Sequence, residues 1–135
     1  MAQVSDRRRV SSGGPWEDLA GYSRAVAVGD ACHVSGTTDA GPDGRSRHPD
    51  DIAAQADAAL AIIEAALREA GFTIDDVVRT RMYVTDIGRS AEVLVVHRRW
   101  FATSRPAATM VQVSALIDPS LLIEIEVDAQ RTRAS

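Results

Sequence analysis

Apolar side chains recur at helical spacing between residues 52 and 70. Positions three, four or seven residues apart lie on one face of an α-helix, so the pattern predicts a helix with one buried side. Asp50 or Asp51 is expected to cap its start, and Gly71 stands where the helix is expected to end. The apolar face consists of Ile52, Ala56, Ala59, Leu60, Ile63 and Leu67.

A second helical pattern covers residues 90–103, with Ser90 as the predicted N-cap. Its apolar face also carries His97. A histidine in such a place is most often a core or interface residue with a satisfied hydrogen bond, and the alternative interpretation is a general base. The positions that define this face are Val93, Val96, His97, Trp100 and Phe101.

Five segments have the alternation or the β-branched composition of strands, namely residues 22–28, 32–37, 77–85, 109–116 and 121–130. A compact turn joins the first two and predicts a hairpin. The element order is therefore ββαβαββ. This order predicts an α+β fold with a single sheet and two helices packed on one face.

Two segments have the composition of irregular structure. Residues 1–14 end in Ser11-Ser12-Gly13-Gly14 and show no apolar period, which predicts a flexible N-terminal segment. Residues 39–50 are rich in glycine and proline and predict an exposed loop. We assign residues 15–131 to one domain.

The predicted sheet has a charged face, because helices can cover only one of its two sides. Cross-strand pairs of opposite charge are worth roughly 0.2–1 kcal/mol each. One interpretation is a solvated outer face; the other is a face covered by a second subunit. The charged face is expected to carry Val77, Arg79, Arg81, Tyr83, Thr85, Leu122, Glu124, Glu126 and Asp128, while Val78, Thr80, Met82 and Val84 are expected to face the helices.

Composition excludes several classes of function. The 135 residues are 45% hydrophobic and 25% charged, as in a globular domain, and no apolar run approaches the roughly eighteen residues that span a membrane. No apolar region follows the N-terminal charges, so we expect a cytoplasmic protein rather than a secreted one. A net charge of -4 and a pI near 5.3 argue against a nucleic-acid partner, and Arg7-Arg8-Arg9 is interpreted as a solvated end.

The residues that usually hold metals or act as nucleophiles are sparse. Cys32 is the only cysteine, and His33, His48 and His97 lack the spacing of a metal site. Ser35-Gly36 lacks the surroundings of a nucleophilic serine, and no glycine-rich phosphate loop occurs. We therefore expect no metal and no cofactor.

Several short motifs, in order along the chain, resemble the Rid family, also called the YjgF/UK114 family. They are Gly21-Tyr22, Val34-Ser35-Gly36, Arg105-Pro106-Ala107-Ala108-Thr109-Met110-Val111 and Ile123-Glu124-Ile125-Glu126. The resemblance implies the chorismate-mutase-like fold of that family, a homotrimer, and clefts between subunits that bind a small metabolite. The best-studied branch hydrolyses enamines and imines derived from amino acids.

The resemblance also assigns roles to individual residues. Tyr22 and Gly36 match binding positions, and Glu124 matches the glutamate that holds the attacking water. The imine-hydrolysing branch has an arginine two residues after the proline that binds the substrate carboxylate, and this chain has Ala108 there. Neighbouring positions expected at the ligand are Thr37, Thr109 and Met110.

Another arginine is then needed to hold a carboxylate ligand. Arg24 shares a strand face with Tyr22 and is the preferred substitute; Arg105 is the second candidate, and Trp16 is a candidate aromatic lid or core plug. Three functions remain open. They are an enamine or imine hydrolase, a non-catalytic ligand-binding or interaction trimer, and, least favoured by the acidic balance, a ribonuclease.

Overall fold

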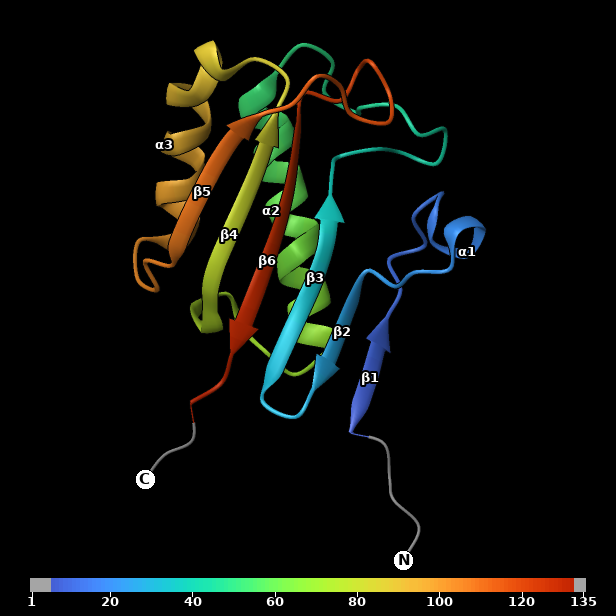
Figure 1. Cartoon of the computed structure of the whole chain (residues 1–135), viewed down its shortest axis with the longest axis vertical. Helices are drawn as coiled ribbons and strands as arrows, with labels where there is room; N and C mark the ends of the chain where they lie inside the picture. The colour runs from blue at the N-terminus through green and yellow to red at the C-terminus, as the bar shows by residue number, and fades with distance from the viewer. Residues whose placement is uncertain (1–5, 133–135) are drawn as a thin grey trace, which may run out of the picture.

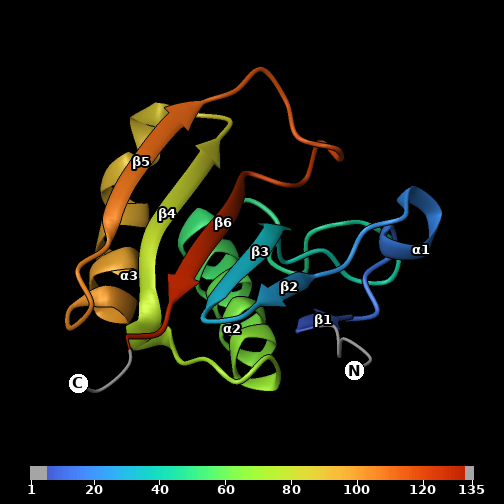
Figure 2. The same ribbon diagram turned by 60° about the horizontal axis from the view of Figure 1, so that its bottom comes forward.

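A single six-stranded sheet organises the computed structural model, which describes residues 6–132 (Figure 1). The strand order is β1-β2-β3-β6-β4-β5, and every neighbouring pair is antiparallel except β4 and β5. Both long helices lie on the same face, as Figure 2 shows, so the predicted α+β arrangement is confirmed. The elements are β1 (Arg7–Val10), α1 (Glu17–Ala20), β2 (Ala25–Val28), β3 (Ala31–Thr37), α2 (Ile52–Glu69), β4 (Val77–Val84), α3 (Ser90–Phe101), β5 (Ala107–Gln112) and β6 (Ile123–Gln130).

Helix α2 confirms the longest predicted helix. The N–H of Ala54 donates to Oδ1 of the N-cap Asp51 over 3.0 Å, and Gly71 follows the helix with a φ of 89°. Only glycine adopts this left-handed conformation without strain, which explains why the helix ends there. All six predicted apolar positions of α2 are buried in the core.

The start of α3 differs from the prediction. Ser90 is the first helical residue rather than the N-cap, because a short 3₁₀ turn over Ile87–Arg89 leads directly into the helix. Asp86 caps that turn by accepting the N–H of Gly88. The N-cap of α3 itself is Arg89, one residue before the predicted position, and its side chain makes no capping hydrogen bond.

Strand β4 also departs from simple alternation. Val77 is buried and Val78 is exposed, which reverses the predicted faces of these two residues. The pairing with β6 shifts register between Val77 and Arg79, and such an irregularity moves the following side chains to the opposite face. From Arg79 onward the predicted alternation is correct.

The prediction of a flexible segment up to Gly14 is wrong for β1, which pairs with β2 from Arg7 to Val10. Backbone hydrogen bonds hold this edge strand, and only Val10 enters the core, so its sequence carries no apolar alternation. The interpretation of Arg7-Arg8-Arg9 as a solvated end is also wrong for Arg8. Its guanidinium donates to the Glu69 carbonyl at the C-terminal end of α2 over 2.9 Å. Residues 1–5 of the predicted segment lie outside the described part.

The face opposite the helices carries the predicted charge pairs. Arg81 donates to Asp128 over 2.9 Å, and the Tyr83 hydroxyl donates to Glu126 over 2.8 Å. These contacts join β4 to β6 in the middle of the sheet. Within residues 6–132 no helix combines the length and the apolar character needed to cross a bilayer.

Candidate functional site

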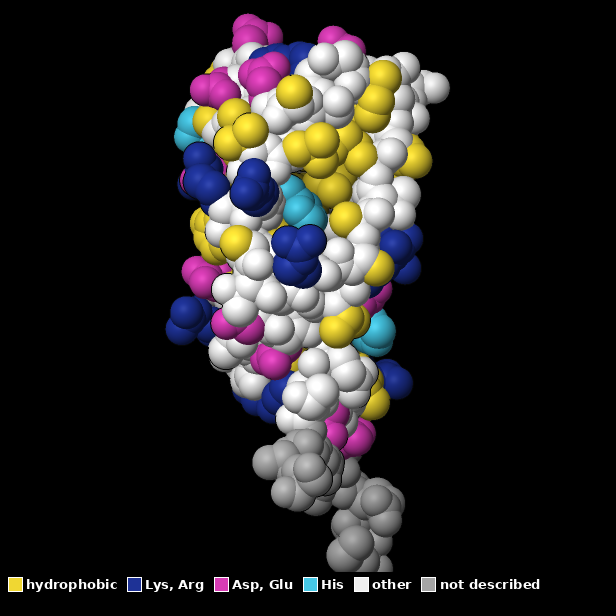
Figure 3. Space-filling model, turned by 90° about the vertical axis from the view of Figure 1, so that its left-hand side faces the viewer, with side chains coloured by type: hydrophobic (Ala, Val, Ile, Leu, Met, Phe, Trp, Pro, Cys, Tyr) yellow, Lys and Arg dark blue, Asp and Glu magenta, His cyan; other side chains and the backbone are white. Residues whose placement is uncertain are grey.

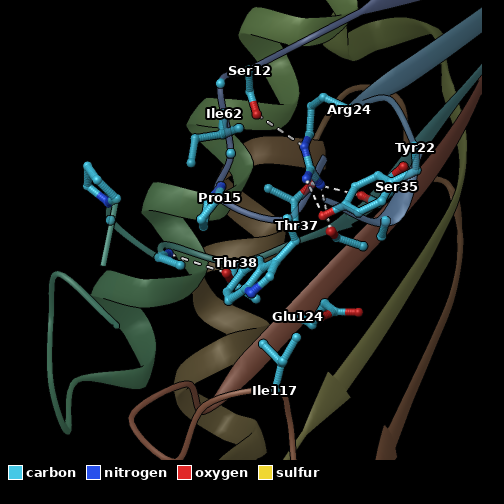
Figure 4. Close-up of a pocket in the computed structure, with 18 of the residues that line it drawn as sticks. Ser12, Pro15, Tyr22, Arg24, Ser35, Thr37, Thr38, Ile62, Ile117 and Glu124 are labelled. Carbon is cyan, nitrogen blue, oxygen red and sulfur yellow. Dashed lines mark hydrogen bonds between the residues drawn. The ribbon is translucent and has the colours of Figure 1, made fainter. Parts of the chain in front are cut away.

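A cleft of about 900 Å³ opens at one end of the sheet, beside β3 and β6 (Figure 4). Its walls come from three stretches that are far apart in sequence: the N-terminal segment, the bulged end of β3, and the loop that precedes α2. One face of β6 and the loop after β5 complete it. The lining residues used below are Ser12, Trp16, Tyr22, Arg24, Gly36, Thr37, Arg47, Ile117, Glu124 and Glu126.

Gly36 brings the backbone of β3 against the side chain of Glu124. The pairing of β3 with β6 is irregular between Val34 and Thr37, so an additional residue bulges at this point. A Cβ atom on Gly36 would lie 2.8 Å from Glu124 Cδ and closer still to its Oε2. Glycine is therefore required for this approach.

Glu124 is the carboxylate best placed for chemistry. It is half-buried and accepts no hydrogen bond from any residue between 6 and 132. Burial and the negative charge of Glu126 raise the pKa of Glu124, and the positive charge of Arg24 lowers it in part. A carboxyl group with a raised pKa and open oxygens can hold water and exchange protons with it.

Arg24 lies in the cleft wall, but its guanidinium is largely occupied. It is 6% exposed, and its Nη1 donates to the Gly36 carbonyl over 2.6 Å and to Thr37 Oγ1 over 3.0 Å. Its Nε donates to Ser12 Oγ, and Nη2 approaches the Tyr22 hydroxyl at 3.4 Å. These contacts use every N–H of the guanidinium except one on Nη2, which remains for a ligand. Arg24 thus braces the bulge of β3 and has little capacity to bind a carboxylate.

Glu17 neutralises Arg24 from the first residue of α1. The two side chains approach to 3.6 Å, and Glu17 is 4% exposed. Burial raises the pKa of Glu17, but hydrogen bonds from Ser12, Ser11 and the backbone of Gly14 outweigh it, and the pKa is lowered. This charged pair fixes the N-terminal segment over the cleft.

Trp16 lines the cleft from the same segment and is half-buried. A Cβ atom on Gly44 would lie 3.1 Å from its ring, so the indole rests on the backbone of the loop that precedes α2. That loop is less exposed than predicted. Asp39 and Ser46 are buried. Asp39 Oδ2 accepts the Ser46 hydroxyl and the N–H groups of Arg47 and His48, and these bonds fold the loop around the Asp39 carboxylate.

The residues of the motif Arg105–Val111 lie outside this cleft. Ala108 and Met110 are the register partners of Thr80 and Met82, on the outer side of β4. The strands β6 and β4 separate β5 from β3, so Ala108, Thr109 and Met110 do not line this cleft. Arg105 is exposed and also lies outside the lining. Of the predicted site, the cleft of a single chain contains the following residues: Trp16, Tyr22, Arg24, Gly36, Thr37 and Glu124.

Two other candidate groups have no reactive environment. His97 Nε2 lies 2.8 Å from Thr80 Oγ1 and its ring packs on Phe101, and burial lowers the pKa of His97. Cys32 is fully buried, and burial raises the pKa of its thiol to about 11. In residues 6–132 no three His, Cys, Asp or Glu side chains are grouped to hold a metal ion.

Sequence reasoning missed Glu17 and Arg47. Neither belongs to a motif or to a periodic element, and both reach the cleft through the folding of irregular segments. The available signal for Glu17 was weak: an acidic residue in the first turn after the Gly-Pro-Trp stretch. For Arg47, no feature of residues 39–50 distinguishes it from Arg45.

The single sheet with both long helices on one face has the arrangement that the resemblance to the Rid family implied. Residues 16–131 match the family model described as endoribonuclease L-PSP, so the chain belongs to this family. An uncharacterized protein of Streptomyces coelicolor is 36% identical over 124 residues, which are 92% of each chain.

Solved structures agree with this assignment. A member of the YjgF/YER057c/UK114 family from Mycobacterium tuberculosis is 53% identical, with a TM-score of 0.84 over 93% of this chain and 99% of that one. The Escherichia coli protein TdcF, solved with bound serine, is 27% identical, with a TM-score of 0.74 over 82% of this chain and 88% of that one. The predicted family is confirmed.

Proposed function

We propose that the cleft binds a small metabolite with a carboxylate group and that Glu124 directs water to hydrolyse its C=N bond. The observation that carries this proposal is the state of Glu124. Its carboxylate lies in the cleft against Gly36, accepts no hydrogen bond from residues 6–132, and has a raised pKa. Such a group is available to take a proton from water and to return it.

The hydrolysis proceeds in two steps. Water oxygen forms a bond to the carbon of the protonated imine, and Glu124 takes a proton from that water, which leaves a neutral carbinolamine. Glu124 then gives this proton to the amino group, the C–N bond breaks, and ammonia departs. The hydroxyl proton passes to solvent as the C=O bond forms, so the products are a carbonyl compound and ammonia.

The class of ligand is supported by the cleft and by a relative. Trp16 and Tyr22 give the cleft aromatic walls, while Glu124 and Glu126 supply negative charge. A ligand with an anionic carboxylate therefore needs a cation on another side of the cleft. TdcF, which shares the fold, holds serine, a small molecule with both a carboxylate and an amine.

A homotrimer would complete the site. Most β5 side chains are exposed, with Val111 at 42%, and Figure 3 shows hydrophobic side chains gathered on the side of the molecule formed by α3 and β5. Three copies around an axis would bring β5 of one subunit, with its Ala108, to the cleft of the next. Sedimentation should then give three times the chain mass of 14.5 kDa, and a monomer would contradict this arrangement.

The hydrolase is tested with 2-iminopropanoate generated in situ. Wild type should accelerate the release of ammonia over buffer, and Glu124→Gln should lose about 10²–10⁴-fold of this rate, the usual contribution of a general acid–base group. Glu126→Gln is the comparison on the same strand face. Glu126 is engaged with Tyr83 and Arg81 and acts on Glu124 only through its charge, so at a pH where Glu124 is ionised in both proteins this variant should keep the rate. Equal rates for wild type and Glu124→Gln would refute the role of Glu124.

A non-catalytic binding trimer is the second candidate. Ala108 carries no charge, and Glu17 neutralises the charge of Arg24. Neither of these two positions therefore attracts a ligand carboxylate strongly. Binding of small acids without accelerated hydrolysis would favour this candidate. The family description also names an endoribonuclease. Given the net charge of -4, we expect no cleavage of a single-stranded RNA in a parallel assay.

A further inference from the structure

We propose that Arg47 binds the ligand carboxylate and so replaces the arginine that Ala108 leaves out. This inference rests on the proposed function, because it concerns the ligand of the same cleft. Arg47 comes from the loop between β3 and α2, not from β5. The cation would therefore reach the ligand from the chain that also contributes Glu124.

The first observation is that Arg47 is the available cation of the cleft lining. Its side chain is exposed, and its guanidinium forms no hydrogen bond or ion pair with any residue in the range 6–132. The other arginine of the lining, Arg24, is buried and paired with Glu17. A ligand carboxylate entering this cleft finds open guanidinium donors on Arg47.

The second observation is that the loop holds Arg47 in place. The backbone N–H of Arg47 donates to Asp39 Oδ2 over 3.1 Å, and the same oxygen accepts the Ser46 hydroxyl over 2.8 Å. Residues Ala40 and Ser46 are joined by an antiparallel bridge across the loop. These contacts fix the backbone before a ligand arrives, which lowers the entropic cost of binding.

The third observation concerns the direction of the side chain. A Cβ atom on Gly41 would lie 3.3 Å from Arg47 Nε and 3.6 Å from its Cγ. The stem of Arg47 thus lies along the backbone of Gly41, which also lines the cleft. Glycine at this position allows the close approach of the Arg47 stem.

The chemistry fits a carboxylate better than a neutral group. A guanidinium offers parallel N–H donors to both carboxylate oxygens, and a charge-assisted pair of this kind is stronger than a neutral hydrogen bond. It also offsets the repulsion that Glu124 and Glu126 exert on an anion in the cleft. The loss of such a contact usually weakens binding by about 10- to 100-fold.

The experiment compares a charged probe with an uncharged one of similar shape. The dissociation constants of pyruvate and pyruvamide are measured by NMR titration for wild type, Arg47→Ala and Arg45→Ala. Arg45 is the matched control, because it is exposed on the same loop and does not line the cleft. Circular dichroism of each variant checks that the fold is intact.

We expect Arg47→Ala to weaken pyruvate binding by about 10- to 100-fold and to leave pyruvamide nearly unchanged. Arg45→Ala should affect neither probe. Unchanged pyruvate affinity in Arg47→Ala, equal weakening of both probes, or no binding of pyruvate to wild type would overturn the assignment of Arg47.

This result is separable from the fate of the hydrolase. If wild type hydrolyses 2-iminopropanoate and Arg47→Ala keeps the same KM, the assignment of Arg47 fails and the hydrolase stands. If wild type binds pyruvate through Arg47 but does not accelerate hydrolysis, the binding assignment stands and the catalytic proposal fails.

Discussion

Replacing Glu17 by alanine should destabilise the protein strongly, because Glu17 is the buried counter-ion of Arg24. Glu17 is 4% exposed and Arg24 is 6% exposed, so the substitution leaves a buried guanidinium without its counter-ion. Breaking a buried pair in this way typically costs roughly 3–5 kcal/mol. The short helix α1 can shift and admit water to Arg24, so we expect the lower end, about 3 kcal/mol.

The measurement is urea unfolding followed by far-UV circular dichroism, at one fixed protein concentration because the proposed trimer would also add stability. Asp18→Ala is the control, since Asp18 is an exposed acidic residue on the same turn of α1. It should change the free energy of unfolding by less than about 0.5 kcal/mol. A loss of under about 1 kcal/mol for Glu17→Ala would show that the pair is not buried in solution.

The pH dependence of this effect has a definite sign. The pKa of Glu17 is lower in the folded protein than its ordinary value of 4.5, so its stabilisation is complete above that value. It is lost as the pH falls through the lowered folded pKa. The difference between wild type and Glu17→Ala should therefore shrink in acid, and a difference that grows in acid would refute the reasoning.

Three further predictions concern the cleft and the core. Gly36→Ala places a Cβ atom 2.8 Å from Glu124 Cδ and should lower imine hydrolysis at least about tenfold without changing the far-UV spectrum; full activity would contradict the close approach. The hydrolysis rate should rise with pH as Glu124 ionises, with a midpoint above 4.5 that Glu126→Gln shifts downward; an unshifted midpoint would remove Glu126 as a cause. Cys32, with a pKa of about 11, should react slowly with iodoacetamide at pH 8 in the native protein and rapidly in urea, as mass spectrometry would show; rapid labelling without urea would argue against its burial.

The parts of the fold that sequence predicts well are those whose side chains obey one period. Helix α2 buries every predicted apolar position, and the hairpin of β2 and β3 forms at its glycine turn. Strand β1 follows another principle, since an edge strand is held by backbone hydrogen bonds and three of its four residues remain exposed. The reversal of Val77 and Val78 comes from an irregular register with β6, which no property of β4 alone reveals.

The residues of the candidate site also fall into two groups: those that stand in sequence motifs and those that only tertiary contacts bring to the cleft. Tyr22, Gly36 and Glu124 stand in motifs, and the structure brings all three to one cleft. The partner of Arg24 could not be read from the strand that carries Arg24, because Glu17 reaches it from a different segment. Glu124, Gly36 and Arg24 could be predicted from the sequence, whereas the pairing of Arg24 with Glu17 and the position of Arg47 depend on tertiary contacts.

The position of the cation decides how strongly ligand binding depends on assembly. An arginine at position 108 would project from β5, which β4 and β6 separate from the cleft of its own chain, so only a neighbouring subunit could present it. With Arg47 as the carboxylate contact, the cation and Glu124 belong to one chain. If the proposed trimer forms, diluting the protein until it dissociates would then weaken pyruvate binding only through the loss of the neighbour's β5 from the cleft. Complete loss of binding on dissociation would instead indicate that the essential cation comes from the neighbour.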